Sequence, residues 1–247
     1  MSKYIVQATW DDAPHLTPEL RDEYWSAIPP YQRDARSKGI PMLGSGAIYP
    51  ILESDIIVEP FKLSAAWPRV FGLDVGWNRT AAVWGAWDQT TDTVFLYDEW
   101  YRSQGEPAIH VAGINARGGN WMPGVIDPAS RGRSQVDGQK LIDVYGGMGL
   151  MLAPANNAVE AGITTVWERM AEGRLKVFSS LQNWRSEFRI YRRDKNGKVV
   201  KSDDHLMDAT RYLMMSGLEI AQTKPGNEQP DYDAHYSDQT RSSVTGY

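Results

Sequence analysis

Three strand-like segments in close succession limit the fold of this chain more than any other feature of its sequence. They are residues 70–75, 81–88 and 93–100, and each is rich in apolar side chains. The turn-rich joints between them, residues 76–79 and 89–92, are very short. Parallel strands need a crossover connection of about a dozen residues or more, so these three strands must form an antiparallel meander.

Helix-like and strand-like segments alternate after the meander. The expected helices are residues 107–117, 138–145 and 159–172, and the expected strands are residues 122–126, 149–153 and 174–178. Such alternation is typical of parallel strands that are joined by crossover helices. The sequence therefore predicts an α/β fold with a mixed β-sheet, made of the antiparallel meander plus parallel strands and flanked by helices.

An auxiliary β-hairpin is expected over residues 189–201. The Asn196-Gly197 pair at its centre is a strong hairpin signal, because both residues readily adopt the backbone conformation of a tight turn. The hairpin directly precedes an acidic helix that we expect from Asp203 to about residue 220.

Composition divides the chain into three parts. Residues 1–66 mix prolines with polar helical stretches and nowhere alternate like a sheet, so they are expected to be a connector. Residues 67–221 hold the predicted sheet and helices. Residues 222–247 have few apolar side chains and are rich in serine, aspartate, glutamine and threonine, which is typical of a disordered tail.

Composition also limits the kinds of site that the chain can form. There are no cysteines, which excludes disulfides and thiolate ligands, so any metal must be held by oxygen ligands or by one of four histidines. No stretch approaches the roughly 20 apolar residues that cross a bilayer, and the N-terminus lacks a signal-peptide pattern. We therefore expect an intracellular protein without a membrane partner.

Three carboxylates lie where such a fold could bring them together around a divalent metal. Asp74 interrupts the apolar run of the first strand, and a buried carboxylate is costly unless a cation accompanies it. Asp127 precedes a proline at the carboxyl end of a strand, the usual side for sites in open α/β sheets. Asp208 shares one face of the last helix with Asp204 and His205.

The net charge of −5 argues at first against a nucleic-acid partner, but the distribution of charge reverses that impression. Residues 185–201 hold seven basic and two acidic side chains, a local charge of +5 that leaves about −10 for the remainder. A basic strip on an acidic body could be a solvated surface or a contact for DNA phosphates. The candidate DNA-binding residues are Arg189, Arg192, Arg193, Lys195, Lys198 and Lys201.

Four segments carry a resemblance to a known family. They are residues 71–77 (FGLDVGW), 97–101 (YDEWY), 125–128 (VIDP) and 204–212 (DHLMDATRY). Together they resemble the nuclease domain of the large terminase subunit of tailed bacteriophages, which has a ribonuclease H-like fold. Residues 8–16, 28–30 and 36–41 resemble the segment that joins the ATPase of that subunit to its nuclease.

The resemblance implies a DNA endonuclease that uses two Mg²⁺ or Mn²⁺ ions to hydrolyse phosphodiesters of concatemeric genome DNA. It implies that Asp74 bridges the two ions, that Asp127 and Asp208 each hold one, and that His205 lies near them. Asp204 and Glu99 are further candidate ligands. The implied partners are double-stranded DNA, the terminase ATPase domain, the small terminase subunit and the portal protein. The implied location is the host cytoplasm, outside the mature virion.

The chain departs from the family in one respect, and two other functions also remain open. The chain has no G-x-x-x-x-G-K-[ST] phosphate-binding loop, so we expect it to lack the ATPase motor. A non-catalytic module that binds DNA or the portal is one alternative. A phosphotransferase of the actin and sugar-kinase class is the other, because Gly72–Gly76 also resembles the first phosphate loop of that class.

Overall fold

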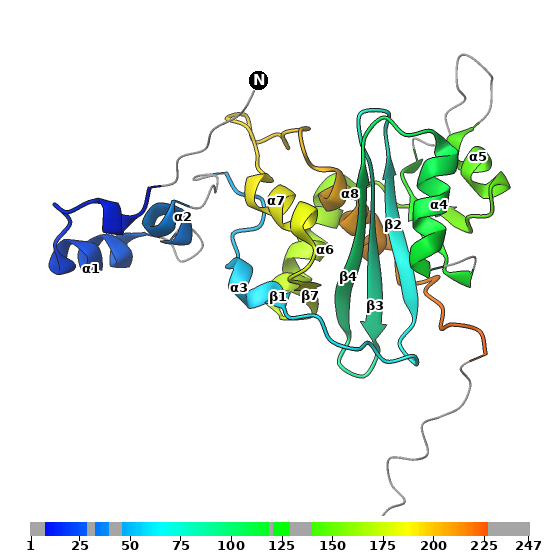
Figure 1. Cartoon of the computed structure of the whole chain (residues 1–247), viewed down its shortest axis with the longest axis horizontal. Helices are drawn as coiled ribbons and strands as arrows, with labels where there is room; N and C mark the ends of the chain where they lie inside the picture. Colours follow the sequence, from blue (N-terminus) through cyan, green and yellow to red (C-terminus); the bar gives the residue numbers. More distant parts are fainter. Residues whose placement is uncertain (1–7, 29–32, 40–45, 119–120, 129–139, 227–247) are drawn as a thin grey trace, which may run out of the picture.

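The computed structural model describes residues 8–28, 33–39, 46–118, 121–128 and 140–226, and its centre is a seven-stranded sheet. The predicted meander is confirmed: β2 (Arg69–Val75), β3 (Thr80–Asp88) and β4 (Thr93–Arg102) pair antiparallel in that order (Figure 1). Short joints thus fix the middle of the sheet.

The parallel strands extend the meander on both sides. β5 (Gly124–Ile126) pairs with β2, and β6 (Leu152–Pro154) lies outside it. β7 (Leu175–Phe178) pairs with the other edge of the meander, along β4. The strand order is β1-β7-β4-β3-β2-β5-β6, so the predicted mixed sheet is confirmed.

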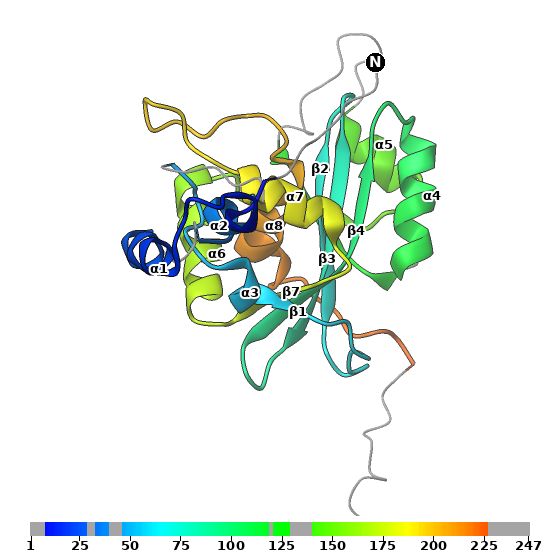
Figure 2. The ribbon, with the colours of Figure 1, turned by 60° about the vertical axis from the view of Figure 1, so that its left-hand side comes forward.

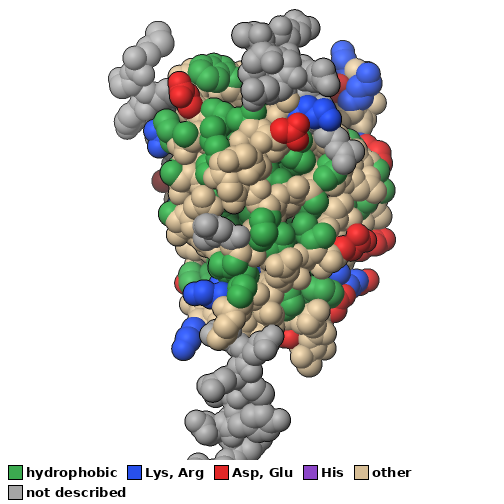
Figure 3. Space-filling model, turned by 90° about the vertical axis from the view of Figure 1, so that its right-hand side faces the viewer, with side chains coloured by type: hydrophobic (Ala, Val, Ile, Leu, Met, Phe, Trp, Pro, Cys, Tyr) green, Lys and Arg blue, Asp and Glu red, His purple; other side chains and the backbone are tan. Residues whose placement is uncertain are grey.

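Helices cover both faces of the sheet (Figures 1 and 2). One face carries α4 (Pro107–Gly118) and α5 (Leu141–Gly147), and apolar side chains show on the outer surface of this layer (Figure 3). The other face carries the three helices α6 (Val159–Ala171), α7 (Gln182–Ile190) and α8 (His205–Tyr212). Helix α8 continues into a π-helical turn over Leu213–Gly217, close to the expected end of the last helix. No described helix has both the length and the apolar character needed to cross a membrane.

Helix α7 is absent from the sequence-based prediction and changes the bounds of the hairpin. Trp184 and Phe188 lie one turn apart on α7, are buried, and stack with their ring centroids 5.2 Å apart. Arg189, which the sequence places in the hairpin, therefore belongs to the last turn of a helix that the core holds in place. The hairpin begins at Arg192, and its strands meet where Arg193 pairs with Val199.

The expected connector also differs from the structure at its C-terminal end. Short helices α1 (Pro18–Ala27) and α2 (Arg33–Lys38) lie in its N-terminal part, before residue 39. However, Ala47 bridges to the hairpin, α3 (Glu53–Ile56) follows, and β1 (Ile57–Val58) pairs with β7 as an edge strand. The sheet therefore begins before residue 67. Most of the expected tail, residues 227–247, lies outside the described residues.

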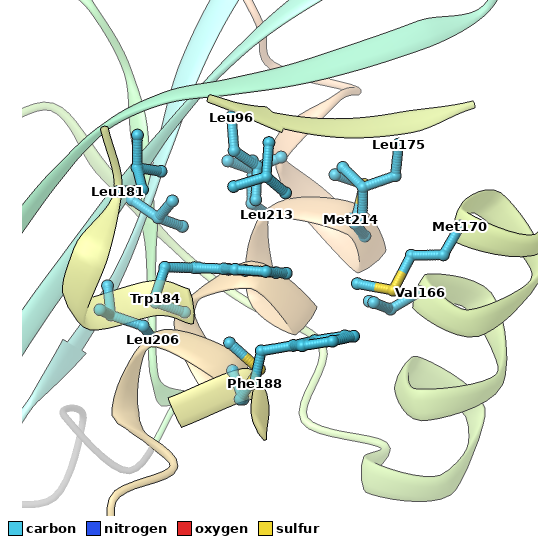
Figure 4. Close-up of a cluster of buried hydrophobic side chains, with 14 of the residues drawn as sticks. Leu96, Val166, Met170, Leu175, Leu181, Trp184, Phe188, Leu206, Leu213 and Met214 are labelled. Atoms are coloured by element: carbon cyan, nitrogen blue, oxygen red, sulfur yellow. The ribbon is translucent and has the colours of Figure 1, made fainter. Parts of the chain in front are cut away.

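The main core lies between the sheet and helices α6, α7 and α8 (Figure 4). Side chains from the sheet strands and from all three helices meet there and exclude water, which is the chief stabilising contribution to such a fold. Those labelled in Figure 4 are Leu96, Val166, Met170, Leu175, Leu181, Trp184, Phe188, Leu206, Leu213 and Met214. A second cluster, around Phe71 and Trp84, packs on the opposite face of the sheet.

Gly72 sets the distance between β2 and α8. A Cβ atom added at this glycine would lie 2.0 Å from the carbonyl oxygen of Ala209, an overlap that the structure could relieve only by moving backbone. Helix α8 can lie this close to the middle of the sheet because position 72 has no side chain.

We predict that Gly72→Ala lowers the free energy of unfolding by about 3 kcal/mol or more, because overpacking against rigid backbone is costly. Denaturant titration of the purified variant measures the loss. Gly146→Ala is the matched control: nothing lies within 4 Å of its added Cβ, and alanine favours helix. Equal stability of the Gly72→Ala variant and the natural protein would contradict the proposed contact.

Candidate active site

Asp74 and Asp127 end two neighbouring parallel strands. Asp74 is near the end of β2, and Asp127 directly follows β5. The two strands pair with Leu73 beside Ile126, and the Asp127 amide donates a hydrogen bond of 3.3 Å to the Leu73 carbonyl. Parallel pairing therefore places the two acids side by side at one edge of the sheet.

Helix α8 packs against β2 and brings Asp208 to the same edge, where its charge acts on Asp74. Burial raises the pKa of Asp74, and the charges of Asp208 and Asp127 raise it further, against a hydrogen bond from His205. Burial likewise raises the pKa of Tyr212, and all three acids act in the same direction on that phenol. Repulsion among three carboxylates is the kind of imbalance that a cation relieves.

His205 is held by the first of these acids. Its Nδ1 atom lies 2.8 Å from Asp74 Oδ2, and both side chains are largely buried. The hydrogen bond to Asp74 raises the pKa of His205 despite the opposing effect of burial. The imidazole therefore takes up a proton more readily than a free histidine and is held in a fixed orientation.

Two cations approach Asp208 from different elements. Arg211, one helical turn away, places its guanidinium 3.0 Å from Oδ1. Lys201, which follows the hairpin, places Nζ 2.7 Å from Oδ2 and 3.1 Å from Oδ2 of Asp204. Asp204 thus shares a cation with Asp208, and the face of the helix inferred from sequence does gather Asp204, His205 and Asp208.

Glu99 has a different position from the other candidates. One of its carboxylate oxygens accepts hydrogen bonds from the backbone and side chain of Asn183, and the other accepts one of 2.8 Å from the Trp184 amide. Both oxygens therefore satisfy amides at the start of α7, where a negative charge is favourable. The structure does not bring Glu99 together with the three acids as a ligand.

The basic strip divides into paired and unpaired side chains. Arg189 and Arg185 both bind Glu53, with N···O distances of 2.6 Å, and Arg193 binds Glu160 at 2.6 Å. Within the described residues, the remaining three hairpin candidates, Arg192, Lys195 and Lys198, have exposed side chains and no acidic partner.

Sequence reasoning missed Glu187, a buried acid beside this site. It is 2% exposed, accepts hydrogen bonds from the Tyr101 hydroxyl and the Leu206 amide, each at 2.6 Å, and so holds the start of α8. The available signal was its spacing from Trp184 and Phe188, which places an acid on the apolar face of a helix.

Burial raises the pKa of Glu187 from 4.5 to about 7. The folded protein therefore keeps a proton that the unfolded chain has already lost, so stability falls as pH rises between these two values. We predict that Glu187→Gln removes roughly 3 kcal/mol of this decline. Urea midpoints from pH 4.5 to 8 measure it, with exposed Glu168→Gln on α6 as control. Parallel curves for the natural protein and the Glu187→Gln variant would contradict the prediction.

The donors fit a hard divalent cation in their chemistry. Carboxylate oxygens are the preferred ligands of such ions, and Asp204 Oδ2 is a buried oxygen that accepts no hydrogen bond within the described part of the chain. Among the described residues, no three acidic or histidine side chains lie in an arrangement that would hold a metal ion. The acids are held instead by His205, Arg211 and Lys201.

A mixed sheet with an antiparallel meander and flanking parallel strands, with acids on β2, directly after β5 and on α8, defines a ribonuclease H-like fold. The chain belongs to the terminase RNaseH-like domain family, whose model matches residues 71–216. The fold and family implied by the sequence are therefore confirmed.

Two relatives place the chain within this family, and a third structure shares its fold. It is 34% identical over 227 residues to the large terminase subunit of Enterobacteria phage LP7, a match covering 88% of this chain and 47% of that protein. The chain spans about half the length of the curated relatives it matches. The nuclease domain of the P22 large terminase is 31% identical with a TM-score of 0.67, covering 73% of this chain and 96% of the other. The magnesium-bound nuclease of the phage G20c large terminase shares the fold, with 16% identity, a TM-score of 0.51, and coverage of 69% of this chain and 97% of the other.

Proposed function

We propose that this chain is the nuclease part of a phage DNA-packaging terminase and cuts DNA by two-metal-ion phosphodiester hydrolysis. The placement of Asp74, Asp127 and Asp208 at one edge of the sheet by β2, β5 and α8 carries the proposal. The likeness to the P22 nuclease domain, and the magnesium bound by the G20c nuclease, support it.

The three acids would hold the ions, with Asp74 between Asp127 and Asp208. Bound Mg²⁺ or Mn²⁺ supplies an activated water and stabilises the leaving oxygen of an in-line displacement. The chain itself contributes fixed positions: β2 and β5 set the first two carboxylates, and the close approach of α8 at Gly72 sets the third. Asp204 is a further candidate ligand on the same helix.

His205 would act on the substrate side of the site. Its hydrogen bond to Asp74 holds the ring and favours the protonated form, so it can face the negative charge of a scissile phosphate. The expected products carry 5′-phosphate and 3′-hydroxyl ends.

DNA contact is proposed for two exposed features, one on the hairpin and one just after β2. Arg192, Lys195 and Lys198 of the hairpin have no acidic partner within the described residues, so their charges are available to phosphates. Trp77, two residues beyond the end of β2, is 69% exposed and offers a surface on which a base can stack. We also propose that the chain works with a terminase ATPase domain, a small terminase subunit and a portal protein, and that it acts in the host cytoplasm.

We predict that the purified chain nicks supercoiled plasmid in Mn²⁺ or Mg²⁺ and not in EDTA. Asp74→Asn and Asp208→Asn should each lower the rate by about 100-fold or more, because each removes a charged ligand of the ions that would stabilise the developing charge of the transition state. Glu168→Gln, an exposed acid on α6, is the matched control and should cut normally. Agarose gel electrophoresis of the time course gives the rates.

Each outcome of this experiment has a distinct meaning. Cleavage that persists in Asp74→Asn would show that another site, or a contaminant, cuts the plasmid. A folded protein that never cuts in either metal would favour the non-catalytic DNA-binding or portal-binding module.

A second prediction concerns the hairpin. Replacing Lys195 and Lys198 together by alanine should weaken DNA binding and reduce the slope of log affinity against log salt by about 2, because each phosphate contact contributes about 0.9. Fluorescence anisotropy with labelled duplex at several salt concentrations measures the slope. Lys62→Ala, an exposed lysine outside the hairpin, is the control. An unchanged slope in the double variant would remove the hairpin from the DNA-binding surface.

A further inference from the structure

Lys201 was expected to contact DNA, but in the structure its ammonium lies among the acids of the site. Nζ is 2.7 Å from Asp208 Oδ2, while the 3.1 Å approach to Asp204 Oδ2 lacks hydrogen-bond alignment. The side chain is 56% exposed and extends from the segment that joins the hairpin to α8. A flexible lysine side chain thus forms an ion pair with a proposed metal ligand.

The two cations on Asp208 are held very differently. The Arg211 side chain is 1% exposed and donates a hydrogen bond of 3.0 Å to Asn157 Oδ1. It also fills the space beside Gly162, where an added Cβ would lie 2.3 Å from the Arg211 Cγ. Arg211 is therefore held by packing as well as by charge. Lys201 reaches Asp208 along a flexible, half-exposed stem and can return to water at little cost.

A divalent ion and the Lys201 ammonium compete for Asp208 Oδ2. A metal bound to that oxygen would lie within a few ångströms of Nζ, where like charges repel strongly in a partly buried site. Arg211 is fixed on the other oxygen, so Lys201 is the group that must move.

We infer that Lys201 is the exchangeable counter-ion of the metal site: it neutralises Asp208 until a divalent cation displaces it. The inference rests on the proposed function, since it assumes that Asp208 binds metal. It adds that metal affinity is set by competition with a side chain of this chain, and that metal binding frees Lys201 for an anionic substrate.

The test is calorimetric titration of Mn²⁺ into the natural protein and into Lys201→Met, without DNA. Methionine keeps the length of the stem and removes the charge. We expect the Kd for Mn²⁺ to fall by about tenfold or more in the variant. In the natural protein Mn²⁺ can bind only the fraction of sites that Lys201 leaves vacant, so the apparent affinity is lower by that fraction. We also expect Mn²⁺ to raise the Tm of the variant more than that of the natural protein.

Controls separate the charge from the substitution. Lys62→Met changes the same residue types at an exposed position outside the site, and Lys201→Arg retains the charge, so neither should bind Mn²⁺ more tightly than the natural protein. Circular dichroism checks the fold, and Lys201→Gln, judged by the same criterion, replaces Lys201→Met if that variant does not fold.

Failure of this inference can be told apart from failure of the proposed function. Equal or weaker Mn²⁺ binding by the charge-removing variants, with plasmid cutting intact in the natural protein, would overturn the exchange alone. Absence of Mn²⁺ binding to all the proteins would overturn both.

Discussion

The contact between helix α8 and strand β2 at Gly72 is the constraint on which the site depends. Only a residue without a side chain lets the Ala209 carbonyl approach this closely, and that approach carries Asp208 and His205 to Asp74. Protein interiors are densely packed and transmit displacement, so a shift of the helix would separate the acids rather than be absorbed locally. The packing of the core beneath α8 therefore also determines the geometry of the site at the start of this helix.

The acids gathered at one edge of the sheet repel one another, and three basic side chains, two from α8 and one from the segment before it, pair with them. His205 lies on Asp74, while Arg211 and Lys201 lie on the two oxygens of Asp208. Arg211 is part of the core, and Lys201 is half in solvent. Because of this difference in burial, the charge of Arg211 is a permanent part of the structure, whereas the ammonium of Lys201 can leave. Lys201 also connects the hairpin to the chemistry of the site.

Much of the fold was predictable from local sequence, and the misses share a physical cause. Short joints require a meander, and alternating helices and strands require parallel pairing, so the sheet was inferred correctly apart from β1. That strand has two residues and gains its structure only by pairing with β7. Helix α7 was missed because its polar residues and the following Asn-Gly turn favour a hairpin locally, whereas burial of Trp184 and Phe188 decides for a helix.

The sequence by itself determined which chemistry was available: hard oxygen donors, no thiolates, two acids at strand ends, and Asp204, His205 and Asp208 on one helical face. The tertiary structure alone decided which charges meet. In the folded chain Glu53 pairs with Arg185 and Arg189, and Glu99 accepts hydrogen bonds at the start of α7. Glu187 is buried beside the start of α8, and Lys201 pairs with Asp208. The reason is that helical spacing and strand ends are properties of neighbouring residues, whereas the energy of an ion pair depends on the distance and burial of groups that only the folded chain brings together.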